Sequence, residues 1–267
     1  MGAKTALLAF VDGDLPAVLR AAGRSQATGS GPMAGEGVRP DAGEAEAVVQ
    51  RLSPGYEVTP IRGGTLFEEC YPPDDVAFAA VLPGAVLLCD RRLVAETPSE
   101  LPEQVLAEAA GRRILLHSMH SVVDALTFAV WEDGQLIRSL SVSPDTGIVE
   151  DIGEPYPFER PYWAGEHPVT PMSPDQGPYP LPFHPLDLGE EALRALFGFV
   201  IEGRREPDDI DADTIPLYGF SVADPSGREQ EEREALMREL MSRMAPPRMY
   251  RMGSDGTMHE AGVEDLF

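Results

Sequence analysis

The sequence has few lysines, few cysteines and no long apolar run, and each shortage excludes a class of protein. Lys4 is the only lysine in 267 residues, and asparagine is absent. Cys70 and Cys89 are too few for a disulfide framework or a zinc site, which indicates reduced thiols and a cytoplasmic protein. No apolar run reaches about 18 residues, so we expect no membrane-spanning helix and no membrane partner.

Positive charge is also scarce. The chain has 21 Lys and Arg residues against 45 Asp and Glu residues, and its formal net charge is −24. This charge repels the phosphates of nucleic acids, so we expect no nucleic-acid partner. The acidity has two open interpretations: it serves solubility alone, or it indicates a protein partner with a basic surface.

Familiar active-site motifs are missing. The chain contains neither GxSxG nor HExxH, and the spacing of its glycine-rich stretch does not match a phosphate-binding loop. We therefore predict no cofactor. The sequence leaves open whether the protein is an enzyme.

The elements that are present predict an α+β fold. Apolar periodicity and turn residues indicate helices and strands in alternation along the chain. Strands are expected at 5–11, around 56–61, twice within 76–89, and at 215–222. Helices are expected at 14–23, 44–52, 97–111 and 187–203. Glycines are expected to end three of these helices, at Gly23, Gly111 and Gly203.

The clearest local signal is Asp133-Gly134, which lies between two stretches of alternating apolar residues. Asp-Gly in this setting predicts a tight β-hairpin. A second turn signal follows at 143–147, so we expect a three-stranded meander over 125–151. The sheet is therefore predicted to be mostly antiparallel, with helices flanking it.

Residues 1–222 are predicted to form a single α+β domain that carries two irregular segments. Residues 24–43 are rich in Gly, Ser and Pro, which predicts a flexible loop. Residues 153–187, here called the proline-rich segment, also contain several aromatic residues. We expect this segment to wrap the domain and bury rings against it, and Tyr162 and Trp163 are candidates for binding a partner.

Residues 223–267 are predicted to be a C-terminal appendage, made of a charged helix at 226–244 and a tail. The helix has an apolar stripe that includes Met237, Met241 and Met244. A methionine stripe can adapt to varied protein partners, so these residues are binding candidates. The alternative is that the helix docks on its own domain.

Two histidines and an aspartate lie close together in ILLHSMHSVVD, residues 114–124. On a helix, His117, His120 and Asp124 would share one face and could begin a transition-metal site. On a strand, the two histidines would point to opposite faces. Because the hairpin requires a strand from about residue 125, we predict an extended chain, diverging histidines and no metal site.

Two further residues are candidates for a cleft near these histidines. Asp12 follows the first strand, and with Asp14 it forms a DxD pattern like that of aspartate-based phosphatases. The favoured interpretation of Asp14 is a helix cap. Cys89 precedes Arg91 and Arg92, which could lower the pKa of its thiol, although a buried structural thiol is the favoured alternative.

Several long blocks of the sequence are distinctive. They include CDRR, GRRILLHSMHSVVD, FAVWEDGQLIRSLSVSPDTGIVEDIGEPYPFERPYWAGE and YPLPFHPLDLGEEALRALFGFVIEG. Through these blocks, residues 1–222 resemble an uncharacterised family of actinomycete proteins, a domain of unknown function. The resemblance implies a soluble bacterial protein, in line with the excess of arginine over lysine, but it implies no activity and no catalytic residues.

These observations favour a non-enzymatic binding or regulatory module. The alternative hypothesis is a metal-dependent, hydrolase-like enzyme that uses His117, His120 and Asp124, with Asp12 and Cys89 in the same cleft.

Overall fold

The computed structural model describes residues 2–28, 41–170, 179–243, 249–252 and 258–261. The chain divides into two units, Met1–Ala223 and Asp224–Phe267. None of the described helices combines the length and the apolarity that crossing a bilayer requires.

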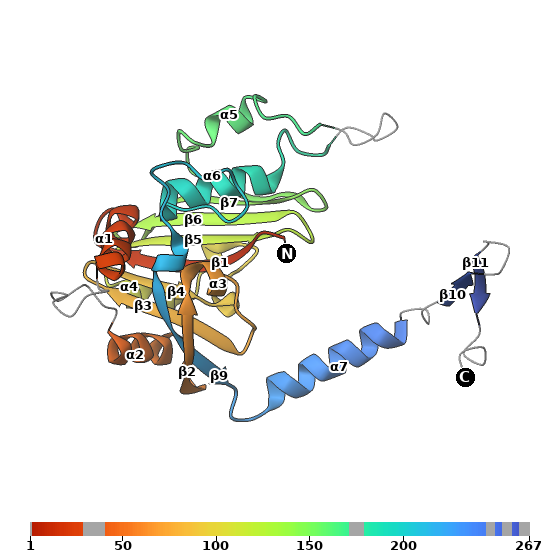
Figure 1. Ribbon diagram of the computed structural model, residues 1–267, viewed down its shortest axis with the longest axis horizontal. Helices are drawn as coiled ribbons and strands as arrows, with labels where there is room; N and C mark the ends of the chain where they lie inside the picture. Colours follow the sequence, from red (N-terminus) through yellow and green to blue (C-terminus); the bar gives the residue numbers. More distant parts are fainter. Residues whose placement is uncertain (1, 29–40, 171–178, 244–248, 253–257, 262–267) are drawn as a thin grey trace. The chain divides into compact units, whose positions relative to one another are not determined.

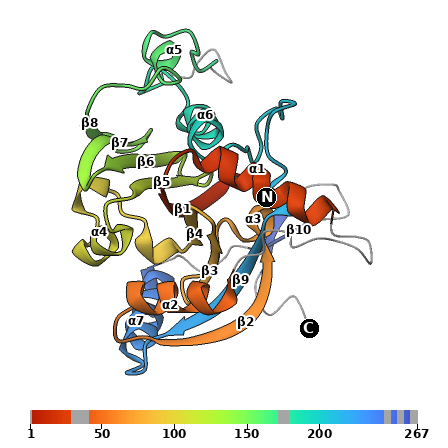
Figure 2. The ribbon, with the colours of Figure 1, turned by 90° about the vertical axis from the view of Figure 1, so that its left-hand side faces the viewer.

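The first unit is built on a nine-stranded sheet in which all neighbouring strands are antiparallel. The strands are β1 (Lys4–Val11), β2 (Glu57–Thr65), β3 (Val76–Leu82), β4 (Ala85–Cys89), β5 (Arg113–His120), β6 (Ala125–Glu132), β7 (Gln135–Ser143), β8 (Gly147–Ile152) and β9 (Pro216–Ala223). Their order across the sheet is β2-β9-β3-β4-β1-β5-β6-β7-β8 (Figure 2). The predicted α+β class with an antiparallel sheet is confirmed.

Helices cover both faces of this sheet (Figures 1 and 2). They are α1 (Leu15–Thr28), α2 (Ala42–Leu52), α3 (Leu66–Glu69), α4 (Glu103–Ala109), α5 (Arg160–Trp163) and α6 (Pro185–Phe197), with short 3₁₀ turns η1 (Arg91–Leu93), η2 (Pro98–Glu100) and η3 (Ala212–Thr214). The face covered by α1, α3, α5, α6 and η3 is called the first face. The face covered by α2, α4, η1 and η2 is called the second face.

Alternation along the strands divides the core between the two faces. On β5, Leu115 and Met119 join the apolar cluster of the first face, whereas Ile114 and Leu116 join that of the second. Successive side chains of a strand point to opposite sides. Because both sides are covered, the central strands β1 and β4 are continuous apolar runs with almost every residue buried.

The hairpin predicted from Asp133-Gly134 is confirmed. These two residues join β6 to β7, with φ of 49° and 75°. A tight hairpin turn needs left-handed backbone at both central positions, which Asp and Gly accept at low cost. A turn at 144–146 then leads into β8, so the predicted meander is also confirmed.

The prediction that Gly23 ends the first helix is wrong, because α1 continues to Thr28. Gly23 instead allows close packing on η3, since a Cβ at this position would lie 2.6 Å from Oγ1 of Thr214. Asp14 caps the helix as predicted: its carboxylate accepts a hydrogen bond from the N–H of Ala17 at 3.3 Å. Of the predicted loop at 24–43, residues 24–28 belong to α1 and 42–43 to α2, and 29–40 lie outside the described residues.

The single helix predicted over 97–111 is also wrong. The chain forms η2 and α4, separated by Leu101 and Pro102 in extended conformations. A residue that precedes proline avoids the helical region, which explains the break at Leu101. Helix α4 ends at Ala109 and is capped by Ala110, with φ of 52°; the predicted stop, Gly111, is the next residue, with φ of 85°.

Helix α6 ends at Gly198 and not at the predicted Gly203. Gly198 adopts φ of 84°, and its N–H donates to carbonyls of the preceding turn. The helix starts at His184, whose Nδ1 accepts a hydrogen bond from the N–H of Leu186 at 3.3 Å. Asp187, where the sequence predicted the start of this helix, lies within its first turn.

The proline-rich segment packs on the first face. Phe183 and Tyr162 are buried there, and further rings are half-buried. Residues 171–178 of the segment lie outside the described residues. Ring burial of this kind is what the sequence predicted for the segment.

The second unit contains the predicted charged helix, α7 (Arg228–Arg243). A short hairpin of β10 (Met249–Met252) and β11 (Met258–Ala261) follows, where the sequence indicated only a tail.

Candidate functional site

The stretch that holds the paired histidines is extended, as predicted. His117 and His120 both lie on β5. His117 is fully buried on the first face, whereas His120 is half-buried and points to the second face. Asp124 lies in the turn after β5, with φ of 47°. These three side chains therefore do not converge on one point.

Both ring nitrogens of His117 have partners inside the protein. Nε2 lies 2.9 Å from the carbonyl oxygen of Gly189 on α6; a carbonyl only accepts, so Nε2 carries the proton. Nδ1 accepts from Oγ1 of Thr5 at 2.8 Å, and this oxygen accepts from the N–H of Met119 at 3.0 Å. Burial lowers the pKa of His117 to about 4, so the ring is neutral and has no lone pair left for a metal ion.

Cys89 lies in the core, two strands away from His117. Leu7 on β1 pairs with Cys89 on one side and His117 on the other, which puts the two side chains about 10 Å apart at ~4.8 Å per strand. Burial raises the pKa of the Cys89 thiol well above its usual value. Arg91 and Arg92 each form an ion pair with an aspartate, which leaves the thiol without activation.

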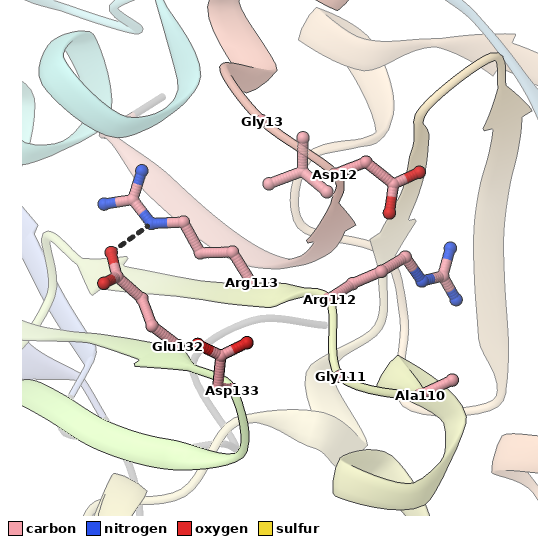
Figure 3. A pocket seen from close by; sticks show the side chains of 9 residues that line it. Asp12, Gly13, Ala110, Gly111, Arg112, Arg113, Glu132 and Asp133 are labelled. Atoms are coloured by element: carbon pink, nitrogen blue, oxygen red, sulfur yellow. Dashed lines mark ion pairs between the residues drawn. The ribbon is translucent and has the colours of Figure 1, made fainter.

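Asp12 lies at the far end of β1 from His120. Lys4, at the start of the strand, pairs with His120, so about 25 Å separate Asp12 from His120 at ~3.3 Å per residue. Asp12 contributes to an open pocket of about 460 Å³ (Figure 3). The pocket is lined by Val11, Asp12, Gly13, Ala110, Gly111, Arg112, Arg113, Glu132 and Asp133. The five residues of the predicted cleft are thus distributed over several places.

Both arginines of this pocket have partners. Nε of Arg113 lies 3.2 Å from Oε1 of Glu132, the ion pair drawn in Figure 3. Arg112 donates to two backbone carbonyls at the end of α4, at 3.0 Å each. Asp12 and Asp133 add two carboxylates to the lining of this pocket. Within the described part of the chain, no three His, Cys, Asp or Glu side chains are arranged to hold a metal ion.

A second concave surface, here called the groove, lies at the opposite end of β6, where Ala125 lines it. It has a volume of about 340 Å³. It is lined by Val94, Ala95, Glu96, Val123, Ala125, Thr127, Ser141, Val142, Ser143, Asp145 and Thr146. The hydroxyls of Thr127 and Ser141 lie 3.1 Å apart on the second face. Such a concave, mostly apolar surface with a few hydroxyls suits a small organic molecule.

The two aromatic binding candidates hold the proline-rich segment on the domain. Tyr162 is buried, its hydroxyl donates to the carbonyl of Asp187 at 3.2 Å, and burial raises its pKa to about 12. Trp163 is half-buried, and its Nε1 donates to Glu159 at 3.4 Å. Both rings are therefore committed to contacts within the domain.

The methionine candidates belong to the second unit. Met237 and Met241 lie on α7, but their side chains are outside what the structure describes, and Met244 lies outside the described residues. Leu236 on the same helix is described, and 56% of its surface is exposed. Leu236 is thus the apolar residue of the predicted stripe whose exposure is known.

The sequence did not predict the contact between His184 and Asp124. Nε2 of His184 lies 3.6 Å from Oδ2 of Asp124, which joins the start of α6 to the turn after β5. The only sequence signal at His184 is the following Pro185, which marks a helix start. Nothing in that signal indicates Asp124 as the partner.

The comparisons with known proteins give a family and no function. No curated protein matches the chain, and no solved structure matches it. A family model matches residues 5–220, from the beginning of β1 into β9, and its description is a family of unknown function. The chain therefore belongs to the family of unknown function DUF6928.

Proposed function

We propose that the protein is a non-enzymatic binding module whose helix α7 docks on a protein partner with a basic surface. The observation that carries this proposal is the exposure of Leu236, 56% of whose surface is open on α7. Large apolar side chains on an exposed helix are typical of helices that dock in a partner's groove.

The sequence of α7 extends this apolar surface. At about 100° per residue, one side of the helix collects all the large apolar residues. In the sequence of α7 these are Leu236, Met237, Leu240 and Met241. Ala235, which is also exposed, lies on the other side. Methionine side chains are flexible and polarisable, so they can fill irregular grooves in a partner.

The charge of the chain supports a basic rim around that groove. The formal net charge is −24, and the first half of α7 presents the exposed glutamates Glu231 and Glu232. Opposite charges at the rim of an interface accelerate association, and their attraction weakens as salt is added. Binding should therefore combine an apolar contact at Leu236 with an attraction that is sensitive to salt.

A capture experiment with two matched variants tests this function. The immobilised full-length chain is exposed to a lysate of the cells that encode it and is then eluted with increasing salt. Leu236→Glu places a charge on the apolar side of α7, and Ala235→Glu places the same charge on the opposite side. We expect a salt-eluted protein to be retained by the wild type and by Ala235→Glu, and to be lost from Leu236→Glu.

Two results would count against this function. One is equal retention of the same protein by both variants, because the apolar side of α7 would then be irrelevant. The other is the absence of any retained protein, together with a size-exclusion profile in which the chain runs only as a monomer.

A further inference from the structure

Three basic side chains gather around the ring of Tyr71. Nζ of Lys4 lies 5.5 Å from the ring centroid, and the guanidinium carbon of Arg91 lies 4.6 Å from it. The ring of His120 packs edge-on against Tyr71 with centroids 5.5 Å apart. We call Lys4, Arg91 and His120 the basic cluster. It contains the only lysine of a chain whose net charge is −24.

The order of the strands brings this cluster together. Lys4 and His120 are paired residues on β1 and β5, and alternation directs both side chains to the second face. Arg91 begins η1, directly after β4, which is the other neighbour of β1. Tyr71 follows Cys70, whose carbonyl accepts from the N–H of Ala6 beside the start of β1.

The positive charges of the cluster exceed the negative charge beside them. Burial lowers the pKa of His120, and the charges of Lys4 and Arg91 lower it further. Arg91 also forms an ion pair with Asp74 at 3.2 Å, in which both side chains are partly exposed. At the cluster, Lys4 and Arg91 carry two fixed positive charges against the carboxylate of Asp74, which leaves one positive charge for an anion. Glu96 and Asp145 add two carboxylates to the lining of the groove.

The groove begins where the cluster ends. His120 pairs with Ala125, which lines the groove, and η1 leads from Arg91 into the groove wall at Val94. Beyond Ala125, the surface continues over Thr127 of β6. One ligand could therefore place an anionic group at the basic cluster and an attached organic group in the groove.

We propose that the basic cluster and the groove form one binding site for a phosphomonoester of a small organic alcohol. The phosphate binds Lys4, Arg91 and His120, and the organic group lies over Ala125 and Thr127. Arginine and lysine form charge-assisted hydrogen bonds to phosphate oxygens, which are stronger than hydrogen bonds between neutral groups. A volume of about 340 Å³ fits a small molecule. This site is independent of α7.

Titration of the full-length chain, followed by NMR of the His120 ring, tests this site. The probes are phenyl phosphate, inorganic phosphate and phenol. We expect phenyl phosphate to shift the ring signals and to raise the pKa of His120, because a bound dianion favours the imidazolium. Inorganic phosphate should bind about tenfold more weakly because it leaves the groove empty, and phenol alone should bind more weakly still.

Matched variants separate the cluster from the groove. Lys4→Gln and Arg91→Gln should each weaken the binding of phenyl phosphate about tenfold. Arg160→Gln removes the same charge from an exposed arginine of α5, on the first face, and should leave binding unchanged. Ala125→Leu fills the groove, and it should reduce binding of phenyl phosphate to the level of inorganic phosphate.

Three results would overturn the proposal. The first is a His120 ring that does not respond to millimolar phenyl phosphate. The second is equal weakening by Arg160→Gln and Lys4→Gln, which would show a general attraction of anions and no site. The third is equal binding of phenyl phosphate and inorganic phosphate, which would remove the groove from the site.

Discussion

Arg138 on β7 and Glu159 in the proline-rich segment form an ion pair in which both side chains are fully buried. Nη2 of Arg138 donates to the carboxylate at 2.6 Å, and Nε donates at 3.0 Å. Glu159 also accepts from the N–H of Tyr156 at 2.8 Å and from Nε1 of Trp163. This carboxylate therefore holds both the backbone and a ring of the segment on the sheet.

Removing the charge of Glu159 should destabilise the domain. In Glu159→Gln the buried guanidinium keeps only Asp151 as an ion-pair partner, at 2.5 Å on the exposed side. We expect the free energy of unfolding to fall by about 3 kcal/mol, as when one partner of a buried pair is lost. Urea denaturation measures this change. Glu154→Gln alters an exposed glutamate of the same segment, and a loss in Glu159→Gln no larger than in this control would refute the role of the pair.

His117 should make the protein sensitive to mild acid. Its pKa is 6.5 when unperturbed and about 4 in the fold, so between these values the unfolded chain binds a proton that the folded chain does not. Stability therefore falls as pH decreases through this window, by about 2 kcal/mol between neutral pH and pH ~5. His117→Leu should be less stable at neutral pH because Thr5 and Gly189 lose their partner, yet its further loss in acid should be smaller. Denaturant unfolding at both pH values provides the comparison.

The control for this pH effect is His167→Gln, which changes an exposed histidine. It should retain the acid sensitivity of the wild type. Identical pH dependence in His117→Leu and the wild type would mean that His117 is not held neutral.

Two glycines with left-handed backbone should respond differently to alanine. Gly153 has φ of 83°, and a Cβ there would lie 2.0 Å from the carbonyl oxygen of Ile137. Gly147 has φ of 72°, but a Cβ there would meet open space. Gly147→Ala should cost about 1 kcal/mol of backbone strain, and Gly153→Ala should cost about 2 kcal/mol more because of the clash. Equal thermal stabilities of the two variants would contradict this description of the end of β8.

Both thiols should be inert in the folded protein. Burial raises the pKa of Cys70 to about 12 and the pKa of Cys89 well above its usual value. The reactive thiolate is therefore scarce near neutral pH, and the surrounding core blocks access. We expect an aromatic disulfide reagent to react slowly with the native chain and rapidly with both cysteines in guanidinium chloride. A fast reaction of one thiol under native conditions would mark an activated cysteine.

Local features of the fold could be predicted from the sequence. The Asp133-Gly134 turn and the Asp14 cap depend on residues within a few positions, and both are present in the structure. The divergence of His117 and His120 is local too, because it follows from an extended chain. The predictions failed where a distant contact decides the outcome. Gly23 lies inside α1 and packs on η3, which is far away in the sequence.

The basic cluster could not be predicted for a related reason. Lys4, Arg91 and His120 meet only because β1 lies between β4 and β5, and the sequence does not state the order of the strands. The partner of Asp124, His184, is likewise set by where α6 begins on the first face. A pattern of residue types contains no information of this kind unless a motif specifies the pairing.

The most direct test of this account is the ¹⁵N NMR spectrum of the two β5 histidine rings in the full-length chain, with and without phenyl phosphate. His117→Gln and His120→Gln assign the signals. We predict that His117 remains neutral, protonated on Nε2 and insensitive to phenyl phosphate down to about pH 5. His120 should titrate and respond to the ligand. A joint shift of both rings on addition of phenyl phosphate or zinc would contradict their placement on opposite faces of the sheet.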